Sequence, residues 1–202
     1  MFSAVASVFS VSARSAAPRV SIVIPAYMEG DGIGPCLDRI LEAVQVPAQI
    51  LVVVDSADDP TCAVVEKQFA DSASVELLVN TYGCGPANAI RYGIDHAAAQ
   101  VVVVTMADGS DDPRLIDDLA KLVERGVVVA AASRYSPGGQ QVGGPALKGF
   151  LSRLAGRSLH TLARVGTHDA TNSFKAYSTS FVREVGIDSR TGFEIGLELT
   201  AK

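Results

Sequence analysis

The sequence predicts an α/β fold in which a mainly parallel sheet carries helices on both faces. Short runs of consecutive Val and Ile recur along the first two-thirds of the chain, and segments with helical spacing of apolar residues separate them. Continuous apolar runs are typical of strands buried on both faces, and their alternation with helices is typical of a parallel, Rossmann-like sheet. The length of 202 residues and the hydrophobic fraction of 48% suit one domain with a sizeable core.

Five strands are expected, each a short apolar run rich in β-branched residues. They cover residues 20–24, 49–54, 75–79, 100–105 and 127–132. The first run ends at Pro25, the second ends at Asp55, and the fourth ends just before Asp108. Polar segments therefore follow the first, second and fourth expected strands.

Helices are expected between these strands, over residues 33–46, 62–69, 86–99 and 114–124. The first stops before Pro47, and Pro86 suits the first turn of the third. A loop rich in Gly and Pro at 136–145 separates the sheet from a further helical segment, and a last helix is expected over 193–202.

The two ends of the chain differ from this pattern. Residues 1–18 are expected to be a disordered or targeting-like leader, since they are rich in Ala, Ser and Val and contain no acid. Residues 19–202 are expected to form one domain. Its last helix stops without Gly, Asn or Pro behind it, which predicts truncation at the C-terminus. No apolar stretch reaches the roughly 18 residues that span a bilayer.

Charge and cysteine content narrow the function. A net charge of −5 argues against a nucleic-acid binder. The three cysteines, Cys36, Cys62 and Cys84, are far apart and show neither a CxxC pair nor metal spacing. They are expected to be reduced and partly buried, in a cytoplasmic protein.

Acidic turns follow three of the predicted strands, at residues 26–29, 55–59 and 108–112. In parallel α/β sheets, ligands bind at the carboxyl ends of the strands. Three carboxylate-bearing turns at one edge exceed what the fold requires, so this edge is the expected ligand site.

Six segments, taken in chain order, resemble the motifs of one family. They are VSIVIPAYME at 20–29, VVDSADDPT at 53–61, GCGPANAIRYG at 83–93, MAD at 106–108, SRYSPGG at 133–139 and DATNSFKAY at 169–177. Together they resemble family-2 glycosyltransferases, which have the GT-A form of the α/β fold, and among these the dolichyl- or polyprenyl-phosphate sugar synthases. The resemblance covers nearly all of residues 20–202.

Three departures accompany the resemblance. Met28 stands where the common family pattern has Asn, and Met106 stands where it has the first carboxylate of Asp-x-Asp. A later family segment, with a basic residue that meets the donor phosphates, would lie beyond Lys202.

The resemblance implies inverting transfer of a sugar from a GDP- or UDP-sugar to a polyprenyl or dolichyl phosphate, with Mg²⁺ or Mn²⁺ as cofactor. Two alternatives stay open: transfer to a glycan hydroxyl in polysaccharide or cell-envelope synthesis, and a non-catalytic nucleotide-binding relic, which Met106 suggests. A sugar nucleotidylyltransferase would need a basic loop after the first strand, and residues 25–34 contain no basic residue.

Asp108 is the candidate metal ligand and catalytic carboxylate, because the departing diphosphate needs charge neutralisation and hard cations prefer oxygen ligands. It follows a strand in a turn rich in Gly, Ser and Asp. Ser110 and Asp111 are candidates to complete the shell, as is water. Asp112 precedes Pro113 and is expected to cap the next helix instead.

Asp55 is expected to accept hydrogen bonds from the ribose or base, as acids do in other nucleotide folds. The alternative is an Asx turn that orders its own loop. Gly85 permits close backbone approach to the nucleotide, although a packing turn is an equal alternative. The same pocket is expected to be lined by Pro25, Ala26, Tyr27, Glu29 and Asp108.

No Asp or Glu occurs between Arg125 and His168. Within this window Arg153, Arg157, His160 and Arg164 share one helical face, broadly opposite several leucines, which predicts a basic amphipathic helix. It is either a solvated face on a packed helix or a surface attracted to anionic lipid, which would place the protein peripherally on the cytosolic face of a membrane.

The acceptor site is given only by the resemblance. It implies that Lys148 and Ser152 contact the acceptor phosphate, and that Arg134 joins them as a catalytic residue. A phosphate acceptor is already ionised and needs no base. A hydroxyl acceptor would need one, with Asp169 as a candidate, although the His168–Asp169 pair is more often structural.

Overall fold

A computed structural model describes residues 17–133, 169, 172–190, 192 and 194–202. The expected loop at 136–145 and the basic amphipathic helix lie outside these residues, as do residues 1–16 of the expected leader. Among the described residues, no helix has both the length and the apolar character needed to cross a membrane.

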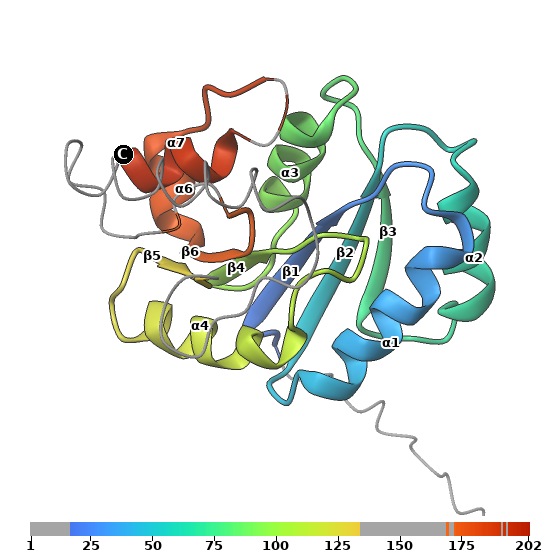
Figure 1. Ribbon diagram of the computed structural model, residues 1–202, viewed down its shortest axis with the longest axis horizontal. Helices are drawn as coiled ribbons and strands as arrows, with labels where there is room; N and C mark the ends of the chain where they lie inside the picture. Colours follow the sequence, from blue (N-terminus) through green and yellow to red (C-terminus); the bar gives the residue numbers. More distant parts are fainter. Residues whose placement is uncertain (1–16, 134–168, 170–171, 191, 193) are drawn as a thin grey trace, which may run out of the picture.

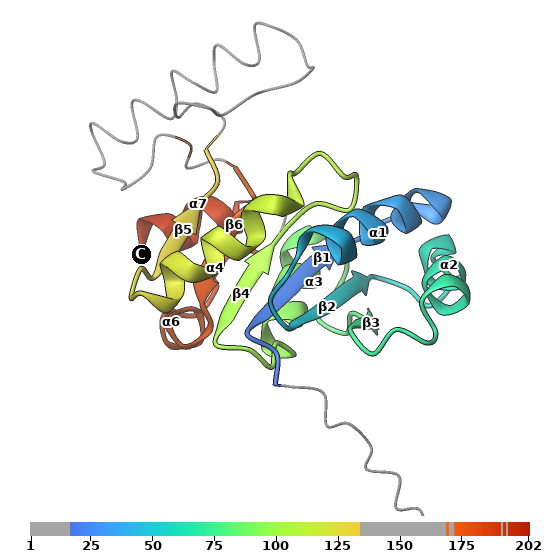
Figure 2. The same cartoon turned by 90° about the horizontal axis from the view of Figure 1, so that it is seen from below.

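Six strands form one sheet in the order β3-β2-β1-β4-β6-β5, with β3 and β5 at its two edges (Figures 1 and 2). Strands β1 to β4 pair in parallel, whereas β6 runs antiparallel to both β4 and β5. The expected mainly parallel sheet is confirmed. The strands are β1 Val20–Pro25, β2 Ala48–Val54, β3 Val75–Val79, β4 Val101–Val104, β5 Val129–Ala131 and β6 Lys175–Ser178.

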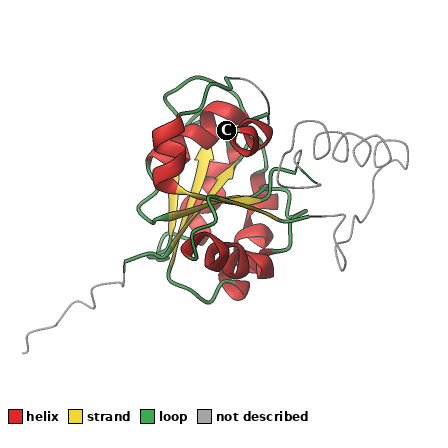
Figure 3. Cartoon of the chain, turned by 90° about the vertical axis from the view of Figure 1, so that its left-hand side faces the viewer, coloured by secondary structure: helices red, strands yellow, loops and turns green. Residues whose placement is uncertain are grey.

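Helices cover both faces of the sheet, as expected, so that Figure 3 shows the strands between two helical layers. One face packs against α1 Ile33–Ala43, α2 Pro60–Gln68 and α4 Ile116–Glu124. The other packs against α3 Pro86–Asp95, α6 Thr179–Val185 and α7 Ile195–Ala201. Two short 3-10 helices are η1 Gly30–Gly32 and η2 Pro113–Leu115.

Both cores draw on the same strands because side chains alternate across a strand. In β1, Ile22 and Ile24 enter one core and Val23 enters the other. Every residue of β1 and β4 is buried, which explains their unbroken apolar runs. The sheet is therefore a rigid support for the turns at its carboxyl edge.

Several boundaries differ from the sequence expectation. The helix expected to begin at residue 62 begins at Pro60, because the Asp59 side chain accepts a hydrogen bond from the Thr61 amide and Pro60 fills the first turn. The first helix ends at Ala43 rather than residue 46, where Val44 becomes extended and turns the chain toward β2. The third ends at Asp95 rather than residue 99.

Strand β6 and helix α6 were not expected from the sequence. Strand β6 lies between β4 and β5 and reverses the sheet direction there. All three cysteines are free, as expected; Cys36 and Cys62 are buried and Cys84 is exposed.

Candidate functional site

The carboxyl ends of β1, β2 and β4 lie side by side, because β1 pairs in parallel with both of the other strands. Pro25 at the end of β1 lies opposite Val53 of β2. The turns at residues 26–29, 55–59 and 108–112 therefore meet at one edge of the sheet, as expected from the sequence.

The turn after β1 is held by the start of α2. The buried Asp59 carboxylate accepts hydrogen bonds from the amides of Met28 at 2.9 Å and Thr61 at 2.8 Å. The Thr61 hydroxyl accepts one from the Glu29 amide at 3.1 Å. Met28 has a φ of +57°, which an ordinary L residue adopts only at a cost. This turn leaves the Tyr27 side chain exposed at the rim of the edge.

The half-buried Asp55 carboxylate joins the end of β2 to residues 83–85, here called the glycine loop, which precede α3. Its Oδ1 accepts from the Asn80 side-chain amide at 2.9 Å, and its Oδ2 accepts from the Gly85 backbone amide at 2.7 Å. Asn80 also donates to the Gly83 carbonyl at 2.7 Å. Gly83 and Gly85 have φ values of +106° and +111°, which require glycine. Asp55 thus orders the loop before α3, whereas the alternative Asx turn would have ordered the loop that directly follows Asp55.

Residues 105–112, here called the acidic loop, follow β4. Asp108 is exposed, and its Oδ1 accepts from the Ser110 amide at 2.9 Å. Its Oδ2 accepts no hydrogen bond from the described residues. The carboxylate of Asp111 turns back toward β4 and accepts from the Thr105 hydroxyl at 2.9 Å and from the Met106 amide at 3.1 Å. Asp108 is therefore the carboxylate of this group that faces solvent.

Asp112 caps the 3-10 helix η2, as its position before Pro113 predicts. Its carboxylate accepts from the Arg114 backbone amide at 3.1 Å and forms an ion pair with the Arg114 guanidinium at 2.7 Å. These hydrogen bonds lower the pKa of Asp112. Both carboxylate oxygens of Asp112 are therefore used in capping η2 and in pairing with Arg114.

Glu29 lies in the field of two other carboxylates. Burial raises its pKa, and the negative charges of Asp108 and Asp59 raise it further. Glu29 and Asp108 therefore face a shared negative region, which is favourable for a divalent cation with oxygen ligands. Among the described residues, no group of three or more His, Cys, Asp or Glu side chains is placed to hold a metal ion. A cation at Asp108 would therefore need phosphate and water oxygens among its further ligands, which is how Mg²⁺ commonly binds.

A buried lysine, which the sequence did not mark as special, supports α7. Lys175 of β6 is fully buried, and its ammonium donates to the Gly196 carbonyl at 2.6 Å and the Thr200 hydroxyl at 2.8 Å. Burial lowers its pKa to about 8, although the negative charge of Asp169 opposes this shift. Asp169 is itself buried, so Lys175 links it electrostatically to α7.

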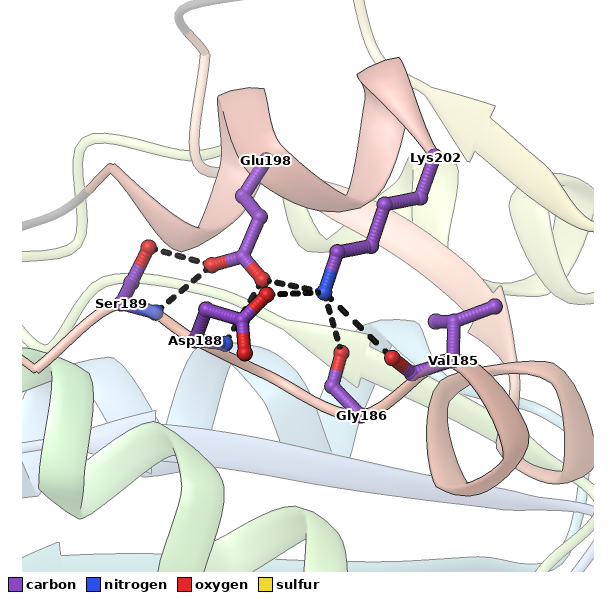
Figure 4. A network of polar contacts seen from close by, with 6 residues as sticks. All are labelled: Val185, Gly186, Asp188, Ser189, Glu198 and Lys202. Atoms are coloured by element: carbon purple, nitrogen blue, oxygen red, sulfur yellow. Dashed lines mark hydrogen bonds and ion pairs between the residues drawn. The ribbon is translucent and has the colours of Figure 1, made fainter.

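A second polar network fastens the other side of α7 (Figure 4). The Glu198 carboxylate accepts from the backbone amides of Asp188 at 2.7 Å and Ser189 at 2.8 Å, and from the Ser189 hydroxyl. Lys202 forms ion pairs with Glu198 at 2.7 Å and with Asp188 at 2.9 Å. Helix α7 is thus tied to the loop that follows α6.

The residues expected to contact the acceptor phosphate, Arg134, Lys148 and Ser152, lie outside the described residues. The described part of the site is the donor side: the ends of β1 and β2, the glycine loop and the acidic loop.

Comparisons with known proteins agree with this architecture. A family model described as "Glycosyl transferase family 2" matches residues 21–186. Polyprenol monophosphomannose synthase of Mycolicibacterium smegmatis is 30% identical over 189 residues, which cover 90% of this chain and 71% of that protein. Dolichol-phosphate mannosyltransferase of Pyrococcus furiosus is 28% identical over 188 residues, covering 91% of this chain and 53% of that protein. The chain thus spans about half of the second relative.

Solved structures share the fold. Mannosyltransferase PcManGT of Pyrobaculum calidifontis, in complex with GDP-Man and Mn²⁺, aligns with a TM-score of 0.57 and 21% identity, over 84% of this chain and 47% of that one. Glucosyl-3-phosphoglycerate synthase of Mycobacterium tuberculosis, in complex with Mn²⁺, UDP and glucosyl-3-phosphoglycerate, aligns with a TM-score of 0.64 and 15% identity, over 92% of this chain and 64% of that one. The α/β fold expected from the sequence is confirmed.

Proposed function

This chain belongs to glycosyl transferase family 2, and on that premise we propose that it transfers a sugar from a GDP- or UDP-sugar to a polyprenyl or dolichyl phosphate, with inversion. The names of its relatives in Mycolicibacterium smegmatis and Pyrococcus furiosus support a lipid-phosphate acceptor. The observation that carries the donor side is the exposed Asp108 carboxylate, which shares a negative region with Glu29 where the ends of β1 and β4 meet.

The donor nucleotide is assigned to the edge formed by β1, β2 and β4. The nucleoside lies beside Asp55 and Gly85. The Gly85 amide already donates a hydrogen bond to the Asp55 carboxylate at 2.7 Å. The backbone of Pro25 and Ala26 and the exposed Tyr27 ring line the same edge. The diphosphate then points toward Asp108, across the end of β1.

A divalent cation, Mg²⁺ or Mn²⁺, supplies the positive charge that the departing diphosphate needs. Asp108 would hold the cation, and the Ser110 amide already fixes Oδ1 of this carboxylate at 2.9 Å. Ser110 and Asp111 remain proposed as further contacts of the shell. Because Met106 brings no carboxylate to this loop, Asp108 is the protein ligand on which the site depends.

The acceptor side rests on the family resemblance. Arg134, Lys148 and Ser152 are assigned to the acceptor phosphate, with Arg134 acting in catalysis, and the basic face at 153–164 is assigned to the cytosolic surface of a membrane. An ionised phosphate oxygen attacks without a general base. Asp169 is buried and its negative charge acts on Lys175, which agrees with a mechanism in which that carboxylate is structural.

Isothermal titration with GDP and UDP, with and without Mn²⁺, tests the donor site. Mn²⁺ is expected to strengthen nucleotide binding by the wild type at least about tenfold, or roughly 1.4 kcal/mol. Asp108→Asn is expected to lose this enhancement. The matched control is Asp112→Asn, which removes one charge from the same loop at a residue committed to capping, and it is expected to keep the enhancement. An unchanged Mn²⁺ effect in Asp108→Asn contradicts the assignment.

A further inference from the structure

Helix α1 holds the acidic loop through its backbone. The guanidinium of Arg39 donates from Nη1 to the Gly109 carbonyl at 2.6 Å and from Nη2 to the Asp111 carbonyl at 3.3 Å. One turn earlier on the same helix, the Cys36 thiol contacts the Met106 carbonyl at 3.7 Å. Three carbonyls of the loop thus meet two side chains of α1.

The contact at Gly109 reaches Asp108 through a single peptide unit. The Gly109 carbonyl and the Ser110 amide belong to the same planar group, so their directions are fixed relative to each other. Arg39 donates to the Gly109 oxygen of this group at 2.6 Å, and the Ser110 N–H of the same group donates to Asp108 Oδ1 at 2.9 Å. A charged donor on the carbonyl also polarises the N–H and strengthens its bond to the carboxylate.

The loop has the conformation that this contact requires. Gly109 has a φ of +68°, and a Cβ atom there would lie 3.0 Å from Arg39 Nη1. Glycine therefore permits both the backbone turn and the close approach of the guanidinium. Both of these hydrogen bonds from Arg39 go to carbonyl oxygens of the loop backbone.

We propose that Arg39 is a positioning residue of the metal site, which sets the Gly109–Ser110 peptide and thereby holds the Asp108 carboxylate ready for the cation that accompanies the donor diphosphate. This inference rests on the proposed function, in which Asp108 is the metal ligand. It explains why a cationic side chain lies beside a loop whose task is to bind a cation.

The sign of the effect separates positioning from simple charge. A guanidinium near a bound cation repels it, so charge alone predicts that removal of Arg39 tightens metal binding. Positioning predicts the opposite. Arg114 provides the comparison, because it lines the same cavity of 510 Å³ as Arg39 and Ser110, but it pairs with Asp112 and is 80% exposed at its side chain.

The experiment measures the Mn²⁺ concentration that half-saturates GDP and UDP binding, for wild type, Arg39→Gln, Arg39→Lys and Arg114→Gln. Arg39→Gln is expected to raise it by about tenfold or more, as the loss of an outer partner of a metal ligand commonly does. Arg39→Lys keeps the charge but not the two-pronged geometry, so it is expected to rescue only part of the loss. Arg114→Gln is expected to leave the value unchanged or lower it. Nucleotide affinity without metal is expected to be equal in all four proteins.

A half-saturation in Arg39→Gln equal to or below that of wild type overturns the proposal, provided that Asp108→Asn has lost the metal effect. If Asp108→Asn keeps the metal effect, or wild type shows none, the proposed metal ligand fails and the role of Arg39 falls with it. The proposal is also overturned if Arg39→Gln loses as much nucleotide affinity without metal as with it, because the residue then supports the fold of the whole edge rather than Asp108.

Discussion

Replacement of Asp55 by Ala should destabilise the chain, because this carboxylate joins β2 to two segments that follow β3. The substitution removes hydrogen bonds from the Asn80 side chain at 2.9 Å and from the Gly85 amide at 2.7 Å. Hydrogen bonds to a charged group contribute about 1.5–3 kcal/mol each. Asn80 keeps its bond to the Gly83 carbonyl, and water reaches the half-buried site, so the expected loss lies at or below the lower end of the sum for two bonds, roughly 2–3 kcal/mol in total.

Thermal unfolding followed by circular dichroism measures this loss. For a chain of this size each kcal/mol shifts Tm by about 2–4 °C, so Asp55→Ala is expected to lower Tm by roughly 4–12 °C. Asp55→Asn, which keeps one acceptor oxygen, should lose about half as much. Asp58→Ala is the control, because Asp58 is exposed on the same loop. If Asp55→Ala unfolds within about 1 °C of that control, which is well below the shift expected for one such hydrogen bond, the carboxylate does not hold the glycine loop.

Two further predictions concern the turn after β1 and the network on α7. Met28→Asn should raise the free energy of unfolding by roughly 0.5–1 kcal/mol, a part of the 1–2 kcal/mol that left-handed backbone costs an ordinary residue. Urea unfolding beside Met28→Ala checks this, and an Asn variant no more stable than the Ala variant contradicts it. Burial alone would raise the pKa of Glu198, but hydrogen bonds from Asp188, Lys202 and Ser189 lower it from 4.5 to about 2. The stabilisation that Glu198 contributes is therefore present above pH 4.5 and lost as the pH falls through about 2. The free energy of unfolding of wild type should approach that of Glu198→Gln over this pH window. A difference in free energy that stays constant contradicts this.

The core of the fold was predictable from local sequence because burial on both faces leaves an unmistakable pattern. The apolar runs of β1, β2 and β4 are buried throughout or nearly so, and their parallel order places the acidic turns at one edge without knowledge of any long-range contact. The cap at Asp112 was equally local, since Asp before Pro determines it.

Other features depend on partners distant in sequence. Strand β6 contains Lys175, a residue type that is usually exposed. Its burial depends on the Gly196 carbonyl and the Thr200 hydroxyl, which accept hydrogen bonds from its ammonium. Asp59 belongs to a polar turn by sequence, and only the fold brings its carboxylate to the Met28 amide, 31 positions away. The contact of Arg39 with the acidic loop spans 70 positions and targets a carbonyl, which no side-chain pattern marks.

Sugar transfer to a lipid phosphate is the direct test of the proposed activity. The full chain is incubated with GDP-mannose or UDP-glucose, Mn²⁺ and polyprenyl phosphate in vesicles, and the lipid is analysed by mass spectrometry and for anomeric configuration. We expect a hexosyl polyprenyl phosphate with inverted configuration, which is absent without metal and lost in Asp108→Asn. Metal-dependent binding of the nucleotide-sugar with no glycosylated lipid, or transfer to a glycan hydroxyl when an oligosaccharide replaces the lipid, contradicts the proposed activity.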